Sequence, residues 1–137
     1  MEAHVKLTDD TFEQQFHKGK LDPSVFSHEA HLRLAWLYIM KYGVEATIAK
    51  ICTEIKNFAL QNGAPHKFNR TVTVAAVKAV HHFVLKSEAK SFSDFIREFP
   101  RLKYRFKDLM RTHYSFDIYS DPKAKEHFLP PDILPFE

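Results

Sequence analysis

Two histidines three residues apart, His28 and His31, open the apolar stretch FSHEAHLRLAWLYI. On a helix, residues at this spacing share a face and their Cβ atoms lie about 5–6 Å apart, so both imidazoles can converge on one point. Both fall in the first turn of a helix that we expect to begin after Ser27, where the positive end of the helix dipole disfavours imidazolium. Because neutral imidazole is the form that binds a metal ion or accepts a proton, the pair is a candidate site.

The two histidines continue the apolar stripe of this helix when side chains are placed at about 100° per residue. The stripe consists of His28, His31, Leu32, Ala35, Ile39 and Tyr42, and the opposite side carries Glu29, Arg33 and Lys41. A structural interpretation competes with the functional one, because a buried imidazole can simply bond a backbone carbonyl or a hydroxyl group. Two adjacent buried imidazoles need several partners, so the pattern leaves both interpretations open.

The other histidines are interpreted from their positions. His81 shares the apolar stripe of its own predicted helix and is expected to point inward, where it could join the pair; a satisfied core histidine is the alternative. His82 falls on the basic side of that helix and is expected to be solvated. The histidines expected at the surface are His4, His17 and His127.

Helix caps and apolar spacing predict the elements that must position these residues. They are a short helix from Thr8 to Gly19, helices over about 28–42, 45–61 and 70–87, a helix from Ser91 to Pro100, an amphipathic segment over 101–112 and a last start at Asp121-Pro122. The β-branched residues of 70–87 are also typical of a strand, but their spacing favours a helix. The tail LPPDILPF is expected to lie extended over the helices. The sequence therefore predicts an all-α fold, with residues 1–137 forming a single compact bundle of about five or six helices.

The composition narrows the class of protein. The 137 residues are 45% hydrophobic and 27% charged, which is typical of a globular domain, and a net charge of +3 does not require a nucleic-acid partner. Cys52 is the only cysteine and cannot form an internal disulfide. The N-terminal sequence does not resemble a signal peptide, and no run of about 18 apolar residues predicts a membrane span. We therefore expect a cytoplasmic protein without a membrane partner.

The motif FSHEAHLRLAW carries a resemblance to a family of small, mostly bacterial, uncharacterised helical proteins. Members typically read an aromatic residue, then Thr, Ser or Arg, then His-x-x-His followed by Leu or Val, and often Arg-Leu-Ala-Trp. The likeness continues through FALQNGAP and RTVT and is weaker in HYSFDIYS and PPDILP. The resemblance implies a helical architecture and the same site candidates, but no particular reaction.

One segment departs from the pattern of these relatives. Where they usually read Tyr-His-Glu-Thr-(Ile/Val)-Thr, this chain reads Phe68-Asn69-Arg70-Thr71-Val72-Thr73. Asn69 can offer an oxygen ligand but cannot shuttle protons near neutral pH. Arg70 places a permanent positive charge where relatives carry a negative one. This change suits an anionic ligand better than a metal ion and makes catalysis less expected here than in a typical relative.

The first functional hypothesis is a polar site inside a helical bundle. Two imidazoles from His28 and His31, with an oxygen from Asn69, could hold Zn²⁺ or Fe²⁺ and leave a position open for a substrate, as in a metal-dependent enzyme. Without a metal, the same groups could bind a small molecule in a mostly apolar pocket. The residues expected to contact such a ligand are Arg70, Thr71, Thr73, His81 and Tyr114.

Two other hypotheses compete with this site. The segment RLKYRFKDLMRTHY mixes basic and aromatic residues and could contact nucleic acid or an acidic protein in a non-enzymatic interaction module. We prefer the interpretation of this segment as an amphipathic helix with a solvated basic face. In the third hypothesis every inward histidine is purely structural.

Overall fold

A computed structural model describes residues 2–136 and confirms the all-α prediction. Within that range the α-helices are α1 (Asp9–His17), α2 (His28–Tyr42), α3 (Val44–Gln61), α4 (Arg70–Val84), α5 (Phe92–Glu98), α6 (Arg101–Tyr104), α7 (Phe106–His113) and α8 (Pro122–Glu126). Three short 3₁₀ turns are η1 (Ala3–Lys6), η2 (Pro23–Val25) and η3 (Pro65–Lys67). The helix count exceeds the prediction partly because the expected helix over 101–112 is divided at Arg105, whose φ of −130° and ψ of 30° leave the helical region.

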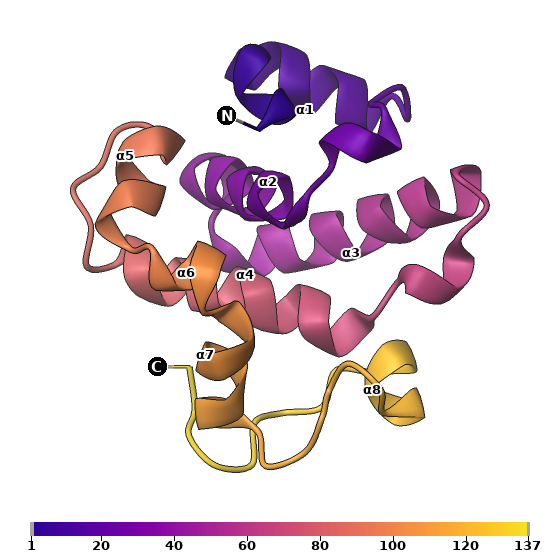
Figure 1. Cartoon of the computed structure of the whole chain (residues 1–137), viewed down its shortest axis with the longest axis vertical. Coiled ribbons are helices and arrows are strands. Elements are labelled where there is room, and N and C mark those ends of the chain that lie inside the picture. The colour runs from indigo at the N-terminus through magenta and orange to yellow at the C-terminus, as the bar shows by residue number, and fades with distance from the viewer. Residues whose placement is uncertain (1, 137) are drawn as a thin grey trace.

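Helices α2, α3 and α4 pack against one another and form the middle of the bundle (Figure 1). Every residue of α2 from Leu32 to Ile39 is buried, which is slightly more than two turns. A helix buried on all sides has no solvent face, so α2 is enclosed by the other elements rather than laid on them. The valines of α4 at positions 74, 77 and 80 are buried against this centre, which confirms the helical interpretation of that segment.

The predicted limits of α2 are confirmed by its caps. The Ser27 hydroxyl accepts a hydrogen bond from the Ala30 backbone N–H at 3.2 Å, which satisfies one of the free donors at the start of the helix. Gly43 ends the helix at a φ of 82°, a left-handed conformation that residues with a Cβ atom rarely adopt. The first turn of α2 therefore begins at His28, where the sequence placed it.

The N-terminal segment covers the side of α2 that was expected to face solvent. Arg33 donates hydrogen bonds to the His4 carbonyl at 2.7 Å and to the Leu7 carbonyl at 2.8 Å, and its side chain is buried. Glu29 is also buried and accepts a hydrogen bond from His4 Nε2 at 2.7 Å. The predictions that Glu29 and Arg33 face outward and that His4 lies at the surface are therefore wrong, because η1 folds across α2 and pairs these charges.

The C-terminal tail lies over α4 and α7, as predicted (Figure 1). His113 Nδ1 donates to the Leu134 carbonyl at 2.7 Å and its ring stacks on Phe136 with centroids 4.1 Å apart. Thr71 donates to the His127 carbonyl at 2.6 Å and accepts from the Leu129 backbone N–H at 3.0 Å. These bonds hold the segment after α8 against the start of α4.

Among the helices of residues 2–136, none combines the length and the apolar character that a bilayer crossing requires.

Candidate functional site

A cavity of about 310 Å³ lies where the first turn of α2 meets the start of α4, and we call it the His31 cavity. It contains His28 and His31 together with Asn69 and Thr73, so four of the residues singled out in the sequence line one space. Apolar side chains of α2, α3 and α4 make up most of the remaining wall, among them Leu32, Ile51, Ile55 and Val77. The site is therefore a mostly apolar pocket with a few polar groups, the usual character of a small-molecule site.

His31 is held in one tautomer by its own helix start. Its Nδ1–H donates to the Ser27 carbonyl at 2.8 Å, which leaves Nε2 without a proton. Among residues 2–136, the His31 ring makes its hydrogen bond through Nδ1, and Nε2 has no partner. The ring stacks on Phe26 with centroids 3.8 Å apart. Burial lowers the pKa of His31 to about 4, so the imidazole is neutral at pH 7 and offers Nε2 as an acceptor.

His28 is anchored by its other nitrogen. Its Nε2–H donates to the Leu102 carbonyl at 2.9 Å, and its ring lies 4.9 Å from that of Phe106. The side chain is exposed, whereas His31 is half-buried. The two rings therefore share the cavity, but each one already makes a hydrogen bond to a backbone carbonyl, as the structural interpretation of the pair anticipated.

Asn69 and Thr73 line the cavity, but both also hold the start of α4 together. The Asn69 side-chain oxygen accepts from the Val72 backbone N–H at 3.0 Å, and its amide group donates to the Ile118 carbonyl at 2.9 Å. The Thr73 hydroxyl donates to the Asn69 carbonyl at 2.8 Å. The main role of Asn69 is thus to cap α4. A ligand could bond only to the second lone pair of its side-chain oxygen.

Four other predicted site residues do not line this cavity. Thr71 is fully buried and uses its hydroxyl to hold the tail, as described above. The Arg70 guanidinium lies 5.5 Å from the centre of the Phe68 ring, outside the cavity lining. His81 sits one turn beyond Val77, the last residue of α4 in the lining. Tyr114 donates its hydroxyl to the Leu129 carbonyl at 2.7 Å and lines a different cavity.

The lining residues that were not predicted for the site include Lys67, Phe106 and Tyr119. Lys67 ends η3, and its position two residues before Asn69 was the one available signal. Phe106 and Tyr119 come from the C-terminal part of the chain. Their approach to α2 depends on how α6, α7 and the following loop fold back, which no local pattern encodes.

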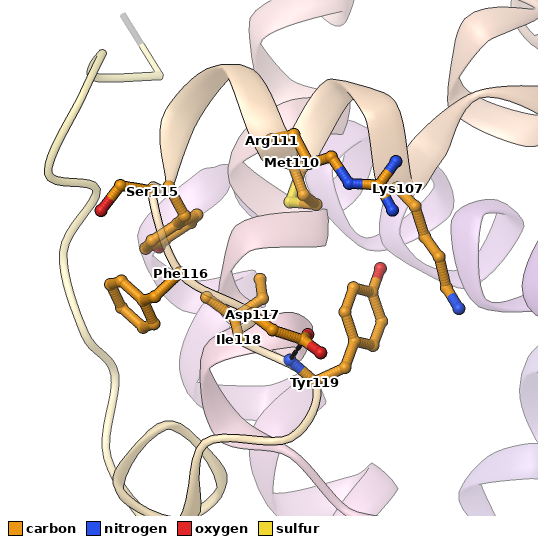
Figure 2. A pocket seen from close by; sticks show the side chains of 9 residues that line it. Lys107, Met110, Arg111, Ser115, Phe116, Asp117, Ile118 and Tyr119 are labelled. Carbon is orange, nitrogen blue, oxygen red and sulfur yellow. Dashed lines mark hydrogen bonds between the residues drawn. The ribbon is translucent and has the colours of Figure 1, made fainter.

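Tyr119 also lines a neighbouring cavity of about 320 Å³, which we call the Tyr119 cavity. Figure 2 shows the Tyr119 hydroxyl directed toward the cationic side chains of Lys107 and Arg111. Lys107 Nζ lies 5.0 Å from the centre of the Tyr119 ring. Burial raises the pKa of Tyr119 to about 12, so the phenol keeps its proton. Its ring therefore separates the basic surface of α7 from the His31 cavity.

A metal ion at His28 and His31 would need more ligands than this pair supplies. Structural and catalytic zinc sites use at least three protein ligands. Over residues 2–136, the one group of three His, Cys, Asp or Glu side chains close enough to hold a metal is Glu2, His4 and Glu29, on the other side of α2. There Lys103 Nζ already lies 3.0 Å from the Glu29 carboxylate and supplies a positive charge.

Comparison of the chain with models of known protein families, with curated proteins and with solved structures found no match. The family resemblance of the FSHEAHLRLAW motif accordingly stays a prediction.

Proposed function

We propose that this protein binds a small, mostly apolar molecule in the His31 cavity, and that a donor group of the ligand bonds to His31 Nε2. The observation that carries the proposal is the hydrogen bonding of the His31 imidazole. Its Nδ1–H is engaged by the Ser27 carbonyl, and Nε2 is left as an acceptor in an apolar cavity of about 310 Å³. That volume lies within the usual range for small-molecule sites, about 300–1,000 Å³.

The pKa of His31 favours recognition over proton transfer. A general base is most effective when its pKa is near the working pH. With a pKa of about 4, the His31 imidazole accepts a hydrogen bond at pH 7 but holds a transferred proton poorly. We therefore assign the ring the role of a fixed acceptor that orients the ligand.

A divalent metal, Zn²⁺ or Fe²⁺, between His28 and His31 is the competing proposal. It would rely on oxygen donors from Asn69 or Thr73 as further ligands, and both side chains already serve the start of α4. Metal analysis of protein purified without a histidine tag separates the two proposals. About one metal ion per chain, lost in the His28→Ala and His31→Ala double variant, would replace small-molecule binding with metal binding.

Two further expectations accompany the proposal. We place the protein in the cytoplasm, where its lone thiol stays reduced; burial raises the pKa of Cys52, which keeps the thiol protonated and unreactive. We do not propose a nucleic-acid interface on α7. Arg111 of α7 and Arg105, which directly precedes the helix, pair with Asp108 at 2.7 and 3.2 Å, which supports the interpretation as a solvated face.

Decanol is a suitable probe because it combines an apolar chain with one hydroxyl donor. We expect it to raise the melting temperature of the wild-type protein. The Ala76→Leu variant fills part of the cavity and should bind decanol weakly. Ala46→Leu makes the same change at an exposed position of α3, outside the lining, and is the matched control.

The His31→Phe variant tests the acceptor. Phenylalanine keeps a ring against Phe26 and removes both nitrogens, and the loss of one hydrogen bond should weaken decanol binding about tenfold. Isothermal titration calorimetry measures the change. Absence of decanol binding to the wild type, or equal binding to wild type and Ala76→Leu, would refute the proposed site.

A further inference from the structure

We propose that the natural ligand of the His31 cavity is an amphipathic hydroxy-carboxylate, with its carboxylate beside Lys67 and its hydroxyl on His31 Nε2. This inference rests on the proposed function and adds the charge and the orientation of the ligand. It follows from the shape of the space around His31 and from the charges that line it.

A second chamber adjoins the His31 cavity. It has a volume of about 270 Å³ and is lined by His31 together with Phe26 and Phe58. Four residues line both spaces: His31, Ile55, Lys67 and Phe68. The two chambers therefore adjoin at these residues, and His31 and Lys67 belong to the walls of both.

The charges around both chambers favour an anion. No aspartate or glutamate of the described chain lines either chamber, whereas Lys67 lines both. Lys67 is exposed, and among residues 2–136 the lysines that form ion pairs are Lys41, Lys50 and Lys103, not Lys67. Because burying a charge without a partner is costly, a ligand cation would find no compensation here, while a ligand carboxylate would meet a free ammonium group.

A single ammonium group fits a monoanion. Arg70 lies over the Phe68 ring and lines neither chamber. A phosphate carries more charge than one lysine balances and is usually held by several donors or by an arginine fork. A carboxylate beside the exposed Lys67 can pair with its ammonium group while staying partly hydrated, and the apolar body of the ligand can fill the His31 cavity.

A hydroxyl group of the ligand supplies the hydrogen-bond donor that His31 Nε2 lacks. An ionised carboxylate has no proton to donate, so it cannot serve Nε2, which is an acceptor. A hydroxyl near the carboxylate can donate to Nε2, because His31 and Lys67 both lie at the junction of the chambers. The carboxylate and the hydroxyl of the ligand would thus be bound by two different side chains.

Three probes separate these contributions: β-hydroxydecanoate, its methyl ester, which lacks the charge, and decanoate, which lacks the hydroxyl. Calorimetry on the wild-type protein should show β-hydroxydecanoate binding about fivefold more tightly than the ester and about tenfold more tightly than decanoate. Lys67→Gln should remove the preference over the ester, and His31→Phe should remove the preference over decanoate. Lys107→Gln, which changes an exposed lysine of the Tyr119 cavity, is the matched control and should leave both preferences intact.

The outcomes distinguish this inference from the proposed function. If the ester binds as tightly as the acid, or if Lys107→Gln removes the preference while Lys67→Gln keeps it, the assignment of the carboxylate is overturned and binding in the cavity still stands. Equal binding of β-hydroxydecanoate and decanoate overturns the hydroxyl contact. If none of the three probes nor decanol binds, the proposed function fails together with this inference.

Discussion

Arg33 should contribute more to stability than any exposed arginine of the chain. Its side chain is 8% exposed and makes hydrogen bonds to the Leu7 carbonyl at 2.8 Å, the His4 carbonyl at 2.7 Å and the Asp9 carboxylate at 2.8 Å. The guanidinium also lies 4.8 Å from the centre of the Phe12 ring. The Arg33→Ala substitution removes all four interactions at once and detaches the N-terminal segment from α2.

The expected cost follows from these contacts. A hydrogen bond to a charged group contributes about 1.5–3 kcal/mol, but the Asp9 carboxylate is 53% exposed and its pair with Arg33 is screened by water. The His4 carbonyl retains a second donor, the Leu7 backbone N–H at 3.0 Å, so it is not left unpaired. We therefore expect Arg33→Ala to lower the free energy of unfolding by about 3 kcal/mol. Arg33→Lys keeps the positive charge but loses the planar guanidinium with its several N–H donors, and it should cost roughly half as much.

Urea unfolding followed by the fluorescence of Trp36, the single tryptophan, measures this change. Arg97→Ala is the matched control, because Arg97 is exposed and its pair with Asp94 is long, at 3.7 Å; it should cost less than about 0.5 kcal/mol. A cost below about 1 kcal/mol for Arg33→Ala, or a cost equal to that of the control, would refute the assignment of a structural role to this buried cation.

Three other predictions concern residues around the site. The pKa of His31 is about 4 in the folded protein against 6.5 in the unfolded chain, so the unfolded state takes up the proton first and stability should fall by up to about 3 kcal/mol as the pH drops from 6.5 to 4; urea unfolding of wild type and His31→Phe over this range should show a fall that is larger in the wild type by this amount, because Glu29 and Glu54, whose pKa values are lowered in the folded state, titrate in both proteins. Asn69→Ala removes the cap of α4 and the hydrogen bond to the Ile118 carbonyl, so it should lower the free energy of unfolding by about 1–2 kcal/mol and lower the melting temperature. The decanol affinity measured by calorimetry should change less than about twofold. Intact stability with lost affinity would instead make Asn69 a ligand contact. Thr71→Val leaves the Leu129 N–H and the His127 carbonyl without the buried Thr71 hydroxyl as partner, so it should cost about 2 kcal/mol and speed hydrogen exchange at Leu129. Unchanged exchange would contradict the role of Thr71 in holding the tail.

Local signals in the sequence were sufficient to predict most of the helices. Ser27 and Gly43 delimit α2 through a side-chain bond and a left-handed φ, and both effects depend on the residue itself and its immediate neighbours. The same holds for Thr8, whose side chain accepts from the Thr11 backbone N–H at 3.2 Å. Caps act over a few residues, so they can be read without knowing the rest of the fold.

The burial of α2 could not be predicted in this way. In a helical-wheel projection, α2 has an apolar stripe and a charged side. A helix with this pattern is expected at the surface, with its charged side exposed to solvent. Here the charges are covered instead, because His4 and Arg33 come together through a contact 29 residues apart in sequence. The pairing of Glu29 with Lys103 spans the chain even further. Helical periodicity carries no information about such distant partners.

The candidate site was predictable where it depends on helix starts and not where it depends on tertiary folding. His31 and Thr73 reach one cavity because each lies in the first turns of a helix whose start the sequence marks. Tyr114 and His81 were expected at the same site but lie elsewhere. Tyr119 lines the cavity instead, because the end of the loop that follows α7 lies beside α2.

The protonation state of His31 tests the central claim most directly, and long-range ¹H–¹⁵N correlation NMR on the imidazole measures it. We predict a neutral ring at about pH 7 with the proton on Nδ1, and a shift of the Nε2 resonance when decanol is added but not when decane is added. A ring with its proton on Nε2, a protonated ring at that pH, or an Nε2 resonance that ignores decanol would contradict the assignment of His31 as the acceptor of the site.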